Sequence, residues 1–244
     1  MRIDPIGVVF NSACPTVFTE NEDDLLLIVS FLLSKVSSYY LEMFSPTLNY
    51  QAGEIRKLPV KNLPNFDKNK ISALVESTKE NWDSYETSWD FCQNPLVRAK
   101  QPSLEQVFNT WQQQNTDAVA EMKRLEEENN KLFIDAYGLQ DELTPEVPDE
   151  QITLIRADRE KDSQSLVSYA LGCMLGRYSL DEPGLIYAYT GNQNFDASRY
   201  QTFPADADGI IPLTEMHWFE DDATHRIGEF LTAVWNKDTL DANM

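Results

Sequence analysis

The sequence predicts an α+β fold that is predominantly helical: a small mixed subdomain, a long strut helix and then an acidic helical domain. Apolar residues recur at helical spacing over residues 22–43 and 104–137, whereas only residues 7–10 and 16–18 have a β-like pattern. The acidic, proline-containing residues 141–150 separate these segments from a further helical region. With 244 residues, 42% of them hydrophobic, the chain can form a packed core.

Residues 22–43 are expected to form one helix. Asn21 suits its N-cap, and the three acidic residues that follow suit the positive end of the helix dipole. Pro46 should end this helix, because proline cannot continue the hydrogen-bonding pattern. A loop, a short strand or turn at residues 55–60 and a short helix at residues 68–77 are expected next.

Residues 104–137 are predicted to form the longest helix. Ser103 and the glutamine three residues later form a capping box, Gly138 provides the stop, and the helix would be roughly 50 Å long. Its polar residues 126–130 are expected to face water. Just before it, residues 81–94 hold two tryptophans, a tyrosine and a phenylalanine, which we interpret as a hydrophobic plug between elements.

A second long helix is expected over residues 157–178, where Gly172 and Gly176 would serve ordinary close packing. A last helix is expected over residues 219–235. Residues 238–244 show no pattern that would close the fold.

The composition favours a cytoplasmic protein without a membrane partner. The N-terminus has no apolar run of signal-peptide length, and the most apolar stretch, residues 25–33, is about half as long as a bilayer span. The three cysteines are far apart and odd in number, which argues against a disulfide framework and indicates a reducing compartment: Cys14, Cys92 and Cys173.

The formal net charge of −20 is unevenly distributed. Residues 1–100 hold 10 Lys and Arg against 13 Asp and Glu, whereas residues 101–244 hold 10 against 27. Nucleic-acid-binding proteins usually carry a basic surface. If this chain binds DNA, residues 1–100 are therefore the better candidate, and the acidic remainder should face away from the phosphates or bind a protein.

The residues contain no recognisable catalytic, cofactor or metal site. The glycines form no phosphate-binding loop, and no Asn-Pro-Pro-aromatic motif is present, because Asn94, Pro95 and Leu96 lack the second proline and the aromatic residue. His217 and His225 are eight residues apart, too far on a helix to share a metal ion without distortion. The sequence thus predicts a non-catalytic binding or scaffold module.

One stretch favours nucleic acid. Residues 48–70 hold five Lys and Arg against two acidic residues, with amides and a tyrosine just upstream. Amides can pair with adenine, and Arg or Lys with guanine or phosphate. An ordinary solvated basic turn remains the open alternative. The DNA-facing candidates are Asn49, Tyr50, Gln51, Arg56, Lys57 and Lys61.

Residues 45–60 (SPTLNYQAGEIRKLPV) resemble the segment NPT-x-N-[FY]-Q-x-G-[DE]-I-x-x-[IL]-P-[VI] in the target-recognition region of single-chain restriction–modification methyltransferases. Ser45 replaces the usual asparagine. Further stretches are similar, in the same order, to the C-terminal region of BREX-type phage-exclusion adenine-specific DNA methyltransferases: residues 84–91 (SYETSWDF), 133–147, 165–180 and 219–222 (FEDD).

This resemblance implies a target-recognition fragment that lacks the family's catalytic domain. S-adenosylmethionine binding is implied only for the full-length member, and no cofactor is assigned to this chain. Residues 1–100 would be the distal part of the recognition domain, which contacts double-stranded DNA and positions the base. Residues 101–140 would be a spacer helix. Residues 151–244 would be an acidic helical domain, and residues 101–244 would contact the missing catalytic domain or another defence-system protein.

The main alternative is an acidic protein-interaction module of the same defence complex that does not contact DNA. The net charge of −17 over residues 101–244 and the long helix favour it. A DNA mimic is less favoured because the acidic residues are irregularly spaced. An enzyme with unrecognised chemistry is the remaining alternative.

Overall fold

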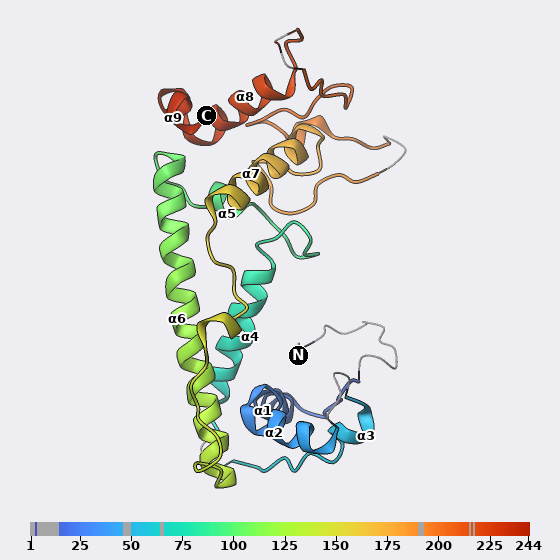
Figure 1. Ribbon diagram of the computed structural model, residues 1–244. Coiled ribbons are helices and arrows are strands. Elements are labelled where there is room, and N and C mark those ends of the chain that lie inside the picture. The colour runs from blue at the N-terminus through green and yellow to red at the C-terminus, as the bar shows by residue number, and fades with distance from the viewer. Residues whose placement is uncertain are drawn as a thin grey trace. The chain divides into compact units, whose positions relative to one another are not determined.

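The computed structural model describes residues 3, 15–45, 50–63, 66–189, 193–214, 216 and 218–244. Over these residues the regular structure is helical and includes no strand, so the expected α+β fold is wrong (Figure 1). Packing divides the chain into two units. Unit 1 comprises Met1–Lys79 and Ala118–Leu154, and unit 2 comprises Glu80–Asp117 and Ile155–Met244. The division into functional domains at 1–100, 101–140 and 151–244 stays a prediction.

The β-like segments within the described part form no sheet. Residues 16–18 are not part of a strand, and residues 56–57 form a turn after the short helix α3 (Ala52–Ile55). A strand needs a neighbouring strand to satisfy its backbone groups, and the described elements of unit 1 are helices, whose backbone groups are largely bonded internally. The expected run at residues 7–10 lies outside the described residues.

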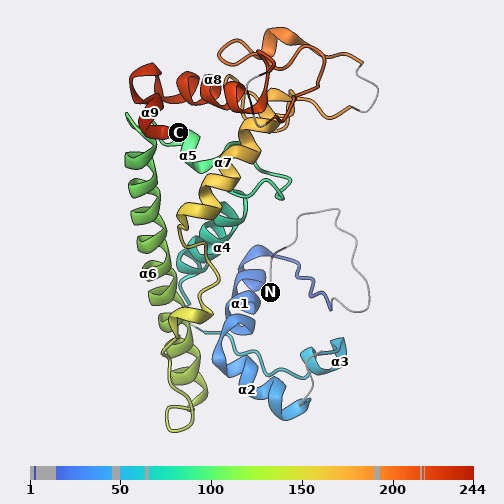
Figure 2. The same cartoon turned by 45° about the horizontal axis from the view of Figure 1, so that its top comes forward.

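Unit 1 begins with α1 (Glu22–Leu33) and α2 (Lys35–Phe44), and the prediction of one continuous helix is wrong. The N-cap is confirmed, since the Asn21 side chain accepts a hydrogen bond from the Asp24 amide at 2.8 Å. The two helices meet at an angle of 69° (Figure 2). Among the described residues no single helix is long and apolar enough to cross a membrane; α1 and α2 have that length and composition only when taken together. The expected stop, Pro46, lies outside the described residues.

Ser34 makes the break between α1 and α2. Its hydroxyl donates to the Phe31 carbonyl at 2.6 Å and accepts from the Ser37 amide at 3.4 Å. The Ser34 backbone amide also donates to the Phe31 carbonyl, at 3.0 Å, so Ser34 closes the end of α1 and its hydroxyl satisfies a free amide at the start of α2.

The long helix α6 (Leu104–Tyr137) begins and ends where the sequence predicts. Ser103 accepts a hydrogen bond from the Gln106 amide at 3.4 Å, and Gly138 ends the helix with a φ of 70°. Residues 118–137 of α6 belong to unit 1, together with most of α4 (Lys68–Trp82), which is longer than the expected 68–77.

Two buried asparagines of α6 hold the junction of α1 and α2, so the expectation that residues 126–130 face water is wrong. Asn129 donates to the Ser30 carbonyl at 2.9 Å and accepts from the Ser30 hydroxyl at 2.5 Å. Asn130 accepts from the Lys35 amide at 2.9 Å and donates to the Pro145 carbonyl at 3.1 Å. These amides satisfy backbone groups that both helix ends leave free.

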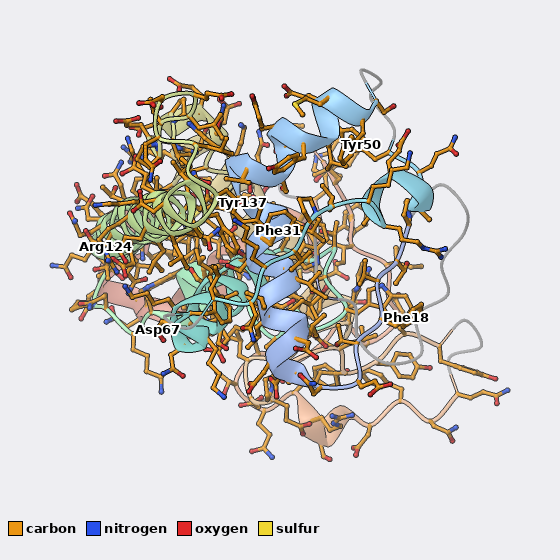
Figure 3. All side chains as sticks on the ribbon, turned by 90° about the horizontal axis from the view of Figure 1, so that it is seen from below. Phe18, Phe31, Tyr50, Asp67, Arg124 and Tyr137 are labelled. Carbon is orange, nitrogen blue, oxygen red and sulfur yellow. The ribbon has the colours of Figure 1, made fainter. Side chains whose placement is uncertain are left out.

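The core of unit 1 is apolar and surrounds this junction. The rings of Phe31 and Tyr137 stack with their centroids 5.7 Å apart (Figure 3). Phe133 meets Phe31 edge-on, with the ring centroids 5.4 Å apart. Burying a side chain as large as phenylalanine stabilises the fold by roughly 2 kcal/mol. The other buried apolar residues of the described part of unit 1 lie in two clusters, apart from Val29: Leu26, Ile71, Leu74, Met122, Leu125, Val147, Ile152 and Leu154 in one, and Val36, Leu41, Leu58 and Ile134 in that of Phe31.

Unit 2 packs around one apolar core. Its helices are the first part of α6, α5 (Pro95–Arg98), α7 (Arg159–Met174), α8 (Ala223–Trp235) and α9 (Leu240–Asn243). Short 3₁₀ segments lie at Ala197–Arg199 in unit 2, at Lys237–Thr239 in unit 2 and at Asp149–Gln151 in unit 1. The core includes Phe91, Val107, Tyr169, Met174, Tyr178, Phe203, Phe230 and Trp235.

The two glycines of α7 have different roles. The Tyr178 ring lies so close to Gly172 that an added Cβ would come within 2.6 Å of it. Gly176 has a φ of 74°, a conformation that disfavours other residues, and it follows the end of α7. The helix therefore ends at Met174, earlier than the expected residue 178.

Several other expectations for unit 2 are wrong. The aromatic residues 81–94 do not form a plug, because Trp82 and Tyr85 are exposed, Trp89 is fully exposed and Phe91 joins the core. The C-terminus does close, since the side chain of Asn243 in α9 accepts a hydrogen bond from the Leu104 amide at 3.1 Å.

The last long helix of unit 2 begins later than expected. It starts at Ala223 rather than at residue 219, because Asp222 is its N-cap and accepts from the His225 amide at 2.8 Å.

Glu86 is a partly buried carboxylate of unit 2. One of its oxygens accepts from the Ser168 hydroxyl at 3.3 Å, and the other is buried without a hydrogen-bond partner among the described residues. Burial raises the pKa of Glu86, and Ser168 and the charge of Arg177 offset this only in part.

We expect Asn129→Ala to lower the free energy of unfolding by about 1–3 kcal/mol, because it leaves two buried groups of Ser30 without their partner. Urea unfolding followed by circular dichroism measures the change. The control is Asn109→Ala, an exposed position on the same helix, where the effect should stay within about 0.5 kcal/mol. Equal stability of the two variants would contradict this role of Asn129.

We expect Glu86→Gln to stabilise the protein at pH 7, since it removes a charge whose ionised form is disfavoured by burial. A raised pKa means that the folded state binds the proton more tightly. The advantage of the variant should therefore shrink as the pH falls through the folded-state pKa and Glu86 becomes protonated. Urea midpoints between pH 7 and 4 test this, with exposed Glu76→Gln as control. A constant difference across this range would contradict it.

Candidate nucleic-acid interface

The candidate residues that the structure describes lie on and beside α3 in unit 1. Gln51, Arg56, Lys57 and Lys61 are exposed, and Tyr50 is half-buried against the core. Asn49 lies outside the described residues.

The sequence around α3 forces the basic side chains outward. The Gln51 amide donates to the Glu54 carboxylate at 2.8 Å, which starts a helical turn. Amide-to-carbonyl hydrogen bonds then continue the turn from Lys57 to Glu54 at 3.0 Å and from Leu58 to Ile55 at 3.1 Å. Ile55 and Leu58 pack into the core, so the exposed residues between them, Arg56 and Lys57, project into solvent.

Lys61 has a structural contact that the sequence did not reveal. Its ammonium donates to the Ala136 carbonyl at 3.0 Å and lies 4.4 Å from the centroid of the Tyr137 ring. Its amide donates to the Tyr137 hydroxyl at 3.1 Å, and that hydroxyl donates to the Pro59 carbonyl. A cation at the C-terminus of a helix is favourable, so Lys61 fixes the segment after α3 to the end of α6.

The remaining basic residues of the stretch are paired with carboxylates. Lys68 contacts Asp23 at 2.9 Å, and Lys70 contacts Glu128 at 2.6 Å. The side chains of Arg56 and Lys57 make no hydrogen bond or ion pair with the described residues. Sequence reasoning could not separate these two groups, because both acidic partners come from other helices.

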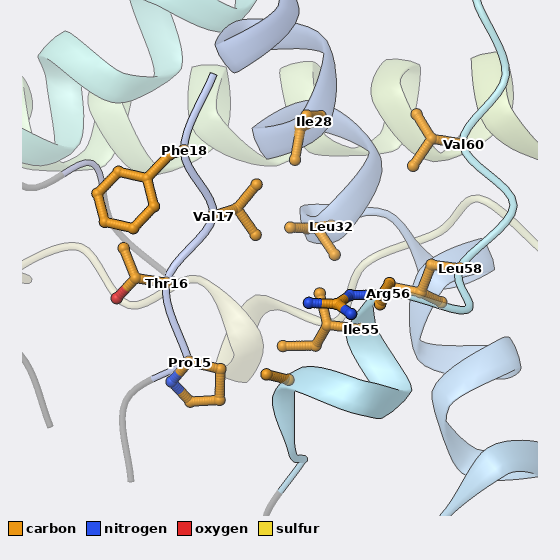
Figure 4. Close-up of a pocket in the computed structure, with 11 residues that line it drawn as sticks. Pro15, Thr16, Val17, Phe18, Ile28, Leu32, Ile55, Arg56, Leu58 and Val60 are labelled. Carbon is orange, nitrogen blue, oxygen red and sulfur yellow. The ribbon is translucent and has the colours of Figure 1, made fainter. Parts of the chain in front are cut away.

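A cavity of about 400 Å³ lies beside Arg56 (Figure 4). Val17 and Phe18 border it from the segment before α1, for which the sequence predicted a strand. Among the described residues that line it, Arg56 is the charged one. The other lining residues are Pro15, Thr16, Ile28, Leu32, Ala52, Ile55, Leu58 and Val60.

The described lining of this cavity combines apolar side chains with one guanidinium. An apolar cavity with a guanidinium at its edge fits an anionic or partly apolar group.

The described nucleophiles and histidine show no reactive arrangement. Burial raises the pKa of the Cys173 thiol to about 12, so this thiol stays protonated at neutral pH. His225 lies 3.5 Å from Glu229, one helical turn away. His217 lies outside the described residues.

Comparison with known proteins relates the chain to part of two longer proteins. No protein-family model matches the chain. Over its whole length it is 37% identical to the adenine-specific methyltransferase PglX of Lacticaseibacillus casei (strain Zhang) and 34% identical to the adenine-specific methyltransferase BrxX of Escherichia coli O9:H4 (strain HS). It spans 21% and 22% of the lengths of these relatives. The resemblance noted in the sequence is therefore confirmed: along its whole length, the chain is homologous to the C-terminal fifth of the adenine-specific methyltransferases PglX and BrxX.

Proposed function

We propose that this chain is the DNA-recognition part of an adenine-specific DNA methyltransferase of a phage-defence system. It contacts duplex DNA in the cytoplasm through Gln51, Arg56 and Lys57. One observation carries this proposal: the side chains of Arg56 and Lys57 are exposed and have no partner among the described residues, whereas the three other basic residues of the stretch are engaged.

The net charge of −20 does not prevent such a contact. Salt screens exposed charges beyond a Debye length, about 8 Å at physiological ionic strength. Arg56 and Lys57 can therefore attract a phosphate that lies close to them despite the net charge of the chain. The carboxylates elsewhere on the chain repel the DNA backbone and so weaken non-specific binding. This favours a contact that depends on fit as well as charge.

The cavity beside Arg56 supports a role in recognition. Arg can donate two hydrogen bonds to a guanine edge, and apolar side chains such as Val17, Phe18 and Val60 can contact a thymine methyl group. Tyr50 is packed against the core and Lys61 is bonded to α6, so we assign these two residues the task of positioning the contact surface. A DNA contact of Asn49 stays a prediction.

Methyl transfer belongs, in this proposal, to the part of the methyltransferase that precedes the matched fifth. That part would also bind S-adenosylmethionine. This chain would hold the duplex so that the target adenine can leave the stack.

We expect Arg56→Ala/Lys57→Ala to weaken binding of the chain to a short DNA duplex, because it removes two cations that would bind phosphates or bases. The slope of log K against log salt should become shallower by about 1 for each phosphate that the variant no longer neutralises. Fluorescence anisotropy at several salt concentrations measures both quantities. The matched control is Arg98→Ala/Lys100→Ala, which removes the same charge from unit 2.

An equal loss of affinity in the Arg98→Ala/Lys100→Ala control would show that net charge alone matters. Unchanged affinity and slope for Arg56→Ala/Lys57→Ala would contradict the assignment of these residues.

We expect Lys61→Met to leave the salt slope unchanged, because the ammonium is bonded to the Ala136 carbonyl rather than free for a phosphate. Loss of this favourable charge at the end of α6 should instead lower the free energy of unfolding by about 0.5–1 kcal/mol. Anisotropy and urea unfolding of the same preparation separate the two effects. A slope shallower by about 1 at unchanged stability would make Lys61 a direct DNA contact.

A further inference from the structure

The segment before α8 combines exposed apolar side chains with a strong negative charge. Residues 206–222, here called the acidic loop, contain six Asp and Glu and no Lys or Arg. Leu213 is 86% exposed, Trp218 70% and Ile210 65%, and Met216 and Phe219 are also exposed. Single exposed apolar residues are common, but five large ones within ten residues mark a site of interaction.

The backbone of the acidic loop is fixed at both ends in unit 2. At its start, the Asp206 carboxylate accepts from the Gly209 amide at 2.7 Å, and the Asp206 amide donates to the Met174 carbonyl at 2.7 Å. Further along, the Ala223 amide donates to the Pro212 carbonyl at 2.9 Å, and Ile211 packs on the core. The loop therefore presents its apolar side chains from an anchored backbone.

Anchoring lowers the entropy that binding must remove from the loop. Trp218, Leu213 and Met216 are the kind of apolar anchors that fill pockets at protein interfaces. The exposed carboxylates of Asp208 and Glu220 add a requirement on the partner, because a docking surface without cations would desolvate them without pairing them.

We propose that the acidic loop docks into an apolar groove rimmed by Lys and Arg on the preceding part of the same methyltransferase. A surface rimmed by Lys and Arg complements the negative charge of the acidic loop. A second copy of this chain, with its own charge of −20, and duplex DNA are both disfavoured by repulsion.

Chain connectivity favours the same occupant. The relatives carry the matched segment within polypeptides about five times as long, so the remainder is held at a high effective concentration. This inference rests on the match to the C-terminal fifth of the methyltransferase and not on the DNA contact of Arg56 and Lys57.

The test is hydroxyl-radical footprinting with mass spectrometry, without DNA, on the 244-residue chain and on the full-length methyltransferase that carries it. Oxidation rates of Met216 and Trp218 report directly on their exposure. We expect both rates to fall at least about tenfold in the full-length enzyme. Trp89, fully exposed in the same unit, is the internal reference and should keep its rate.

A matched pair of variants of the full-length enzyme tests the mechanism. Leu213→Asp removes an anchor and adds a charge while leaving both probes in place, and should raise the oxidation of Met216 and Trp218 at least about threefold, as expected when a hot-spot residue is removed. Leu185→Asp, at another exposed leucine of unit 2, should leave both rates low.

Three results would overturn the proposal. The first is that Met216 and Trp218 are oxidised at the same rate in the 244-residue chain and in the full-length enzyme. The second is that Trp89 is protected in the full-length enzyme as strongly as Met216 and Trp218. The third is that the 244-residue chain is a dimer that Leu213→Asp converts to a monomer. Each of these can occur whether or not Arg56 and Lys57 bind DNA, so the two proposals fail separately.

Discussion

The structure of unit 1 depends on hydrogen bonds from α6 to the backbone groups that the break between α1 and α2 leaves unpaired. A helix that stops at Leu33 and restarts at Lys35 leaves carbonyls and amides unpaired inside the core. Asn129 and Asn130 satisfy two of these groups, the Ser30 carbonyl and the Lys35 amide, and the Ser34 hydroxyl satisfies the Ser37 amide. Because a buried unpaired backbone group is costly, the bend is stable only while α6 supplies these amides.

The bend in turn sets up the candidate interface. With α2 turned away from α1, the Phe31, Phe133 and Tyr137 rings pack together, and Tyr137 contacts the segment after α3. Lys61 adds a second contact between that segment and α6. The direction in which Arg56 and Lys57 project therefore follows from contacts with a helix more than 70 residues further along the chain.

Local signals in the sequence predicted local structure well. The Asn21 cap and both ends of α6 follow from capping and stop residues that lie beside them. The break at Ser34 could not be predicted, because it is stabilised by side chains about 95 residues away. Lys68 and Lys70 each form an ion pair with an acidic residue of another helix, whereas Arg56 and Lys57 form none with the described residues. This difference could not be predicted from the neighbouring sequence either. The strand expected at residues 16–18 is not found, and the described elements of unit 1 are helices, whereas residues 7–10 lie outside the described residues.

In the turn after α3, the residues that hold the backbone in place are not the residues that face outward. Ile55, Leu58 and Lys61 carry its packing and its tether, while Gln51, Arg56 and Lys57 contribute little to the core. Substitutions at such exposed positions usually change stability by no more than about 0.5 kcal/mol. Over evolutionary time, Arg56 and Lys57, which fall on two of the unspecified positions of the segment that residues 45–60 resemble, can therefore vary on an unchanged scaffold. If they contact DNA as proposed, a lineage could change its recognised sequence here without first acquiring compensating mutations.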